Sequence, residues 1–307
     1  MTDTRSARIL TLLALADEAP EADELAEFLT DPEPDVRRTA LTVLSEATED
    51  WANGSTQVAA ALLDPDASVR RTGIELLAEL REVLVAGEEF TAALRCAGQH
   101  VDPAVRTAAI GTLWRHHRAT ALEAADYLGD PEPAVRAEAV LALVSLRAAG
   151  PLERAAADPA AEVRAAVARE LGSSADPHGA STLTALANDE QTTVAAAAFT
   201  ALAETGCPPP AAALATEALR HRDWPVREAA AKALAAAPAE LAATPLTVAT
   251  GDENLDVRKA AVRSLGHLAP DHLDVTAALR TATDDPDADV RAYARQALLR
   301  YPQPTER

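Results

Sequence analysis

Histidine side chains next to acidic residues are the first candidates for chemistry in this sequence. His100 and His221 each precede an aspartate by two positions, Asp102 and Asp223. A His-x-Asp pair could supply half of a metal site. The two pairs lie too far apart in the chain to share one ion, so we expect each histidine to cap its own turn instead.

The other nucleophilic or metal-binding side chains form no recognisable constellation. His116 and His117 fall at a predicted helix end, where histidine commonly interacts with the helix dipole. Cys96 and Cys207 lie far apart, and we expect both to be buried free thiols. The motifs G-x-S-x-G, H-E-x-x-H, C-x-x-C and the P-loop do not occur. The sequence therefore predicts no catalytic residue, no metal and no cofactor.

A recurring motif, D-P-x-x-x-V-R-x-x-A, determines where these residues lie. Its proline and acidic residue predict a turn at the start of a helix. Apolar residues four, five and eight positions after the valine predict one face of that helix. A second, shorter apolar helix precedes each turn. The valine occurs nine times, 28 to 36 residues apart, at Val36, Val69, Val105, Val135, Val163, Val194, Val226, Val257 and Val290.

An arginine follows the valine in eight of the nine copies, and Ala195 replaces it in the sixth. Arginine and carboxylate can pair through two parallel hydrogen bonds. We therefore expect a ladder between neighbouring repeats, built from the arginines and the turn aspartates. Its predicted members are Asp31, Arg37, Asp64, Arg70, Asp130, Arg136, Asp158, Arg164, Asp252, Arg258, Asp285 and Arg291.

Each repeat is predicted to be two antiparallel helices that bury their apolar faces only by stacking on their neighbours. The motif resembles the short bacterial HEAT-like repeats, the type found in phycobilin lyase subunits. The resemblance implies an all-α fold, a right-handed α-solenoid of about nine two-helix HEAT-like repeats. Gly54, Gly87, Gly150 and Gly206 are expected where helices end.

The domain organisation follows from where the repeats begin and end. Residues 5–17 align with the second helix of the first repeat but lack its turn, which is typical of a degenerate cap. We predict an N-terminal capping helix at 1–20, a single elongated repeat array at 21–301 and a C-terminal tail at 302–307.

Composition narrows the partner class. The 307 residues carry a formal charge of −20, which argues against nucleic acid or an anionic membrane as the partner of the whole molecule. No stretch reaches the ~18–20 apolar residues that span a bilayer. We expect a cytoplasmic protein, and its oligomeric state stays open.

The resemblance implies that the second helices line a concave face. The side chains expected there balance to +2, with the basic ones concentrated in the last repeats. A positive groove on a negative protein attracts an acidic ligand. The predicted partner-binding residues are Arg169, Trp224, Lys232, Lys259, Arg263, His267, Tyr293 and Arg300.

Two function classes follow. The first is a non-enzymatic scaffold that binds an acidic segment of another protein on its concave face. The second is a HEAT-type enzyme or enzyme subunit, similar to a DNA glycosylase or a phycobilin lyase. The His-Glu pairs that deoxyhypusine hydroxylase uses are absent here, so that activity is not carried over.

Overall fold

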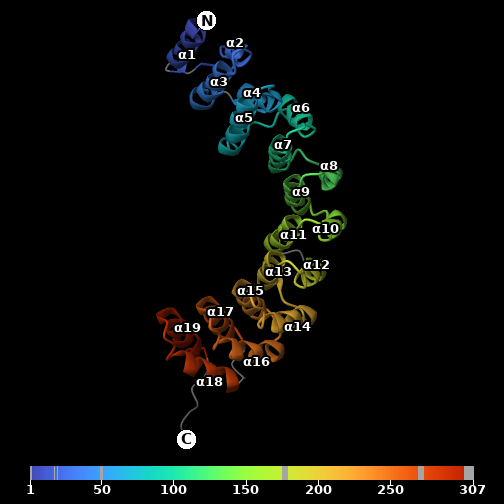
Figure 1. The fold of residues 1–307 in the computed structure, drawn as a ribbon, viewed down its shortest axis with the longest axis vertical. Helices are drawn as coiled ribbons and strands as arrows, with labels where there is room; N and C mark the ends of the chain where they lie inside the picture. Colours follow the sequence, from blue (N-terminus) through green and yellow to red (C-terminus); the bar gives the residue numbers. More distant parts are fainter. Residues whose placement is uncertain are drawn as a thin grey trace. The chain divides into compact units, whose positions relative to one another are not determined.

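The computed structural model describes residues 2–16, 18, 20–48, 51–174, 179–268 and 273–300. Every regular element in this part of the chain is a helix, which confirms the predicted all-α class (Figure 1). The helices divide into two compact units, unit 1 at 1–146 and unit 2 at 147–307. Each unit is described by itself below.

Unit 1 consists of a first helix and four helix pairs, in which the second helices pack side by side in a row. Helix α1 lies within the predicted N-terminal cap at 1–20, and its capping role stays a prediction. The bounds are α1 (Thr2–Ala16), α2 (Ala26–Leu29), α3 (Pro34–Ala47), α4 (Trp51–Ala60) with η1 (Ala61–Leu63), α5 (Ala67–Glu79), α6 (Glu88–Ala97), α7 (Pro103–Arg115), α8 (Ala121–Asp126) with η2 (Tyr127–Gly129), and α9 (Pro133–Ser145).

Unit 2 contains five further pairs, so the described residues hold nine pairs in all, the number that the motif predicts. The bounds are α10 (Ala149–Ala155), α11 (Ala161–Ser174), α12 (Gly179–Leu186), α13 (Thr192–Thr205), α14 (Pro209–Ala218), α15 (Trp224–Leu234), α16 (Ala239–Ala249), α17 (Leu255–Leu265), α18 (Leu273–Ala282) and α19 (Ala288–Leu298). The predicted tail at 302–307 lies outside the described residues, and the single array at 21–301 stays a prediction.

The turn before each second helix folds as its residue types require. In the first repeat the Asp31 carboxylate accepts a hydrogen bond from the Glu33 N–H at 2.8 Å, and Pro34 begins α3. Proline suits this position because the N–H that it lacks would have no partner within the helix. Val36 follows and is fully buried. The motif therefore begins a helix and anchors it in the core in one step.

Several ladder arginines join their own turn to the next one. Arg37 donates from Nε and from one terminal nitrogen to the two carboxylate oxygens of Asp64, both at 2.7 Å. Its other terminal nitrogen donates to the Asp31 carbonyl of its own turn. The same two-bond pairing to a carboxylate occurs at Arg106–Asp130, Arg164–Asp189, Arg227–Asp252 and Arg258–Asp285.

Ladder arginines also donate to carbonyl groups of their own turns. Arg136 donates to the Asp130 carbonyl at 2.8 Å, and Arg291 donates to the Asp285 carbonyl at 2.8 Å. The Asp158 carbonyl accepts from Arg164. In unit 1 the row extends into the cap, where Arg8 of α1 forms an ion pair with Asp31.

Of the four glycines predicted at helix ends, two lie there and two lie inside helices. Gly87 caps the start of α6, and Gly206 ends α13 with a φ of 109°, as expected of glycine in the left-handed region. Gly54 and Gly150 instead lie inside α4 and α10. At Gly54 the reason is packing, because a Cβ there would lie 3.3 Å from the Trp51 ring.

Candidate functional site

Four of the predicted partner-binding residues meet in unit 2, at the ends of α17 and α19. Arg263 lies on α17 and His267 just after it, while Tyr293 lies on α19 and Arg300 just beyond its end. Together with Gly266, Gln296 and Ala297 they line a pocket of about 280 Å³. We call this the α17–α19 pocket.

The walls of this pocket are held by contacts between the two repeats. The guanidinium carbon of Arg263 lies 5.4 Å from the centre of the Tyr293 ring, which is a cation–π distance. Arg300 donates to the Gly266 carbonyl at 3.1 Å. A Cβ at Gly266 would come within 3.0 Å of the Ala297 Cβ, so a glycine permits this close approach. His267 closes one side, with its Nδ1 2.7 Å from the Arg263 carbonyl.

The charge of the pocket is positive and unbalanced. Arg263 and Arg300 have no carboxylate partner among the described residues. Both side chains are exposed at the surface. Guanidinium groups in this setting favour carboxylates, which accept two parallel hydrogen bonds from one arginine. The arrangement can therefore bind an anion against an aromatic ring.

The other four predicted residues lie outside this pocket. Lys259 of α17 is bound to Asp289 at 2.8 Å and lies 3.8 Å from Asp287, so its charge is already paired. The hydrogen bond with Asp289 raises the pKa of Lys259. Lys232 pairs with Glu228, one turn away on α15, at 2.7 Å.

Arg169 and Trp224 complete the predicted set. Arg169 is exposed on α11. Trp224 is the first residue of α15, and 42% of its surface is exposed. Neither residue lines the α17–α19 pocket. Tryptophan is nevertheless one of the residue types that are enriched among the anchors of protein interfaces.

The two histidines that replace the turn aspartate each cap their own turn. His100 Nδ1 accepts the Asp102 N–H, and His221 Nδ1 accepts the Asp223 N–H, each at 3.0 Å. This confirms the capping role expected of both. His116 instead packs edge-on against Phe90, and burial lowers its pKa. Among the described residues, no group of three or more His, Cys, Asp or Glu side chains could hold a metal ion.

The two thiols have different environments. Cys207 is buried, and this burial raises its pKa to about 11. Cys96 is exposed on α6, so the expectation that it is buried was wrong. Its side chain lies on the outer surface of that helix because α6 packs through Phe90 and Leu94 instead. No helix in the described ranges combines the length and the apolar character needed to cross a membrane.

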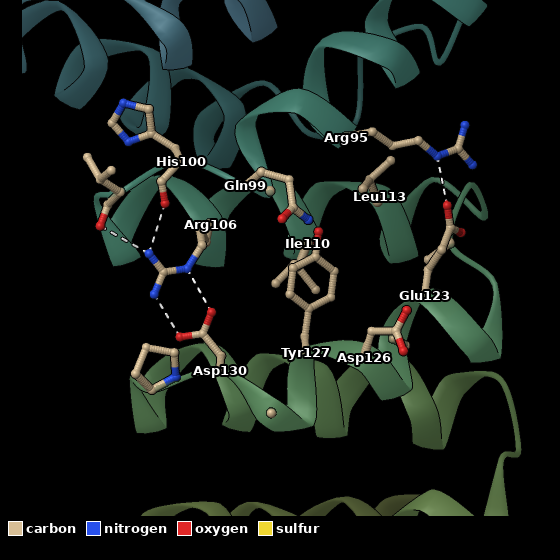
Figure 2. Close-up of a pocket in the computed structure, with 16 residues that line it drawn as sticks. Arg95, Gln99, His100, Arg106, Ile110, Leu113, Glu123, Asp126, Tyr127 and Asp130 are labelled. Carbon is tan, nitrogen blue, oxygen red and sulfur yellow. Dashed lines mark hydrogen bonds and ion pairs between the residues drawn. The ribbon is translucent and has the colours of Figure 1, made fainter.

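Sequence reasoning missed a larger pocket in unit 1. It measures about 790 Å³ and lies between the end of α6, the middle of α7 and the short helices α8 and η2 (Figure 2). Tyr127 stands in it. A tyrosine directly after a short helix, in a chain with only 3% aromatic residues, was the available signal.

Comparison with known proteins supports the architecture. Residues 148–235 and 212–299 match the family model described as HEAT repeats. The fold is similar to that of an engineered protein, with 19% identity over 94% of this chain and 90% of that one, at a TM-score of 0.55. No curated protein matches the chain in sequence.

Two natural structures are similar as well. A structure of Kap95p binding to RanGDP matches at 14% identity, over 95% of this chain and 49% of that one, with a TM-score of 0.56. Importin beta matches at 18% identity, over 91% of this chain and 40% of that one, with a TM-score of 0.54. The chain thus spans about half or less of the length of these two proteins. At such identities the likeness shows the fold alone, an α-solenoid. The phycobilin-lyase type and the bacterial origin stay predictions.

Proposed function

We propose that this protein is a non-enzymatic interaction scaffold, and that unit 2 binds an acidic segment of a partner protein. The observation that carries the proposal is the α17–α19 pocket, where two arginines without carboxylate partners among the described residues flank Tyr293. The fold gives general support, because stacked helical repeats present extended surfaces for binding.

The size of the pocket favours one side chain as the direct ligand. About 280 Å³ is just below the usual range for a small-molecule site, but it accommodates a single Asp or Glu side chain. Arg263 and Arg300 would pair with the carboxylate, while Tyr293 would cover the adjoining methylene groups. Arg tends to anchor interfaces because its planar fork matches a carboxylate.

The rest of the segment would run along the second helices of unit 2. Trp224, Lys232 and Arg169 lie on α15 and α11, which belong to the same row of packed helices as α17 and α19. We infer that this row forms the concave binding face. Lys259 contributes chiefly to the fold, since Asp289 already holds its ammonium group.

The test compares two double variants of the full chain in a pull-down from cell lysate. Arg263→Glu with Arg300→Glu reverses the charge of the pocket. Arg280→Glu with Arg295→Glu makes the same change on two exposed residues of the α18–α19 pair that do not line it. We expect a recurrent partner to be lost from the first variant and retained by the second, and a glutamate-rich peptide to compete with that partner.

Equal binding by both double variants would reject the α17–α19 pocket. Salt-sensitive retention of DNA by the unmodified chain would favour the enzymatic class instead, since nucleic-acid affinity falls steeply with ionic strength.

A further inference from the structure

The unit 1 pocket is bounded on two sides by ion pairs. On one side Arg106 binds Asp130 through two bonds of 2.7 Å, and on the other Arg95 donates to Glu123 at 2.8 Å (Figure 2). Each pair joins one repeat to the next. The walls are therefore fixed by contacts that exist without a ligand, and the pocket is preformed.

The floor of the pocket is apolar. Ile110 and Leu113 of α7 and Ala124 of α8 line it and are almost fully buried. Tyr127 rises from η2 toward Gln99, and its hydroxyl lies so close to Gly98 that a Cβ there would be only 2.2 Å away (Figure 2). Gly98 thus allows the aromatic ring to stand in the pocket. A large apolar or aromatic group would find matching surface here.

Apolar side chains also remain in solvent near the pocket. Val101, which lines it, is 89% exposed, and Leu122, the residue before the lining Glu123 on α8, is 75% exposed. Exposed apolar surface around a pocket is characteristic of protein interfaces, where neighbouring contacts exclude water from a central anchor. This favours a polypeptide over a free small molecule as the occupant.

The electrostatics select a basic ligand. Residues 1–146 contain 26 acidic and 12 basic side chains, a net −14 of the chain's −20. At the pocket itself both arginines are paired, whereas the exposed Asp126 on the rim has no ion-pair partner in the described part of the chain. Such a field attracts cations and repels acidic segments.

We infer that the unit 1 pocket binds a basic segment of a partner protein, with one large apolar or aromatic side chain inserted beside Tyr127. Lysine or arginine residues on either side of that anchor face Asp126 and the acidic surface of unit 1. This site is independent of the proposed acidic-segment site in unit 2 and opposite to it in charge.

Fluorescence anisotropy with defined peptides tests the inference on the full chain. The probe is a short lysine-rich peptide with one central phenylalanine. Two matched peptides replace the phenylalanine by serine or every lysine by glutamate. We expect the serine peptide to bind about tenfold more weakly or worse, since burying a phenylalanine contributes ~1.5–3 kcal/mol. We expect no measurable binding of the glutamate peptide.

Two charge reversals locate the contact. Asp126→Arg should weaken the lysine–phenylalanine peptide by roughly threefold or more, because the reversed charge lies on the rim. Glu46→Arg changes the net charge equally, on an exposed residue of α3 that does not line the pocket. It should have a much smaller effect. Hydrogen exchange should show peptide-induced protection in α6, η2 and the turn at Val101.

Four results would overturn the inference. Three are equal affinity for the phenylalanine and serine peptides, equal effects of the two reversals, and absence of binding at millimolar peptide. The fourth is competition by phenethylamine as strong as that by the peptide, which would identify a small-molecule site. The arginine double variant of the α17–α19 pocket should leave this binding unchanged, which separates the two sites.

Discussion

Replacing His100 by aspartate should stabilise unit 1, because the ladder is interrupted there. Arg70 is the one ladder arginine followed by a turn histidine instead of an acidic residue. Its Nε is buried without a hydrogen-bond partner, and its nearest carboxylate oxygen, on Asp102, is 3.8 Å away. One terminal nitrogen still donates to the Asp64 carbonyl at 2.8 Å, so the side chain is in the ladder conformation.

The expected stabilisation can be estimated from the intact arginine–aspartate pairs. Arg37 makes two bonds of 2.7 Å to Asp64, and His100→Asp would offer Arg70 the same acceptor. Hydrogen bonds to charged groups contribute ~1.5–3 kcal/mol each. Removing a further carboxylate from water offsets part of this gain. Since the Arg70 side chain is only 15% exposed, we expect a net stabilisation of about 1–3 kcal/mol.

The turn can accept this change. Asp64 and Asp66 already occupy the equivalent two positions of the preceding repeat, where Asp64 pairs with Arg37 while accepting the Asp66 N–H at 2.8 Å. An aspartate at position 100 could therefore keep the bond to the Asp102 N–H that His100 now makes. The substitution adds a partner without removing a cap.

Hydrogen exchange of the full chain is the suitable assay, because stacked repeats need not unfold in one step. Exchange in α5 and α7 should slow by ~5- to 150-fold, the equivalent of 1–3 kcal/mol. His100→Asn is the matched control, since it keeps an acceptor for the turn but adds no charge. If it protects equally well, or if the gain from His100→Asp persists in an Arg70→Met background, the ladder argument is refuted.

Three further predictions concern the arginine–aspartate ladder and the packing between neighbouring repeats. Ala195→Arg and His221→Asp should each be neutral or destabilising alone but stabilising together in urea unfolding, because together they restore one arginine–aspartate pair of the ladder. Additive effects of the two substitutions would contradict this. Gly172→Ala should lower the unfolding midpoint despite the helix propensity of alanine, since its Cβ would lie 2.8 Å from a side-chain carbon of α13. Gly150→Ala, inside α10 and with open space around it, should not lower the midpoint. Hydrogen bonds from Arg164 hold the pKa of Asp189 below its usual 3.8. The pair therefore stabilises the fold above that pH, and this stabilisation is lost on further acidification. In urea titrations between about pH 5 and pH 2, Asp189→Asn should reduce the acid-induced drop in the free energy of unfolding.

The ladder could be anticipated from sequence because its geometry is local. The aspartate, the valine and the arginine belong to one turn, and a nearly constant repeat length places each arginine beside the next turn. The intact pairs join residues 24 to 27 positions apart. Only stacking in register, which the apolar spacing enforces, is needed to predict such a contact.

The free charges of the surface could not be anticipated in the same way. Lys259 and Arg263 lie one turn apart on α17 and look equivalent in the sequence. The structure shows that Asp289 reaches Lys259, while Arg263 lies over Tyr293. Which of them stays available depends on side-chain directions in the following repeat. The unit 1 pocket was missed for a related reason, because it arises from a short α8 and a glycine at position 98.

Departures from the motif coincide with cavities in both units. His100, which interrupts the ladder in unit 1, lines the pocket around Tyr127. Ala195 and His221, the substituted pair in unit 2, both line a separate pocket of about 260 Å³. If these repeats only had to stack, an arginine–aspartate pair at each of the two positions would make the fold more stable. Positions that give up such a contact are where function is expected to compete with stability. The repeat therefore specifies the solenoid, and its exceptions indicate where a ligand should be sought.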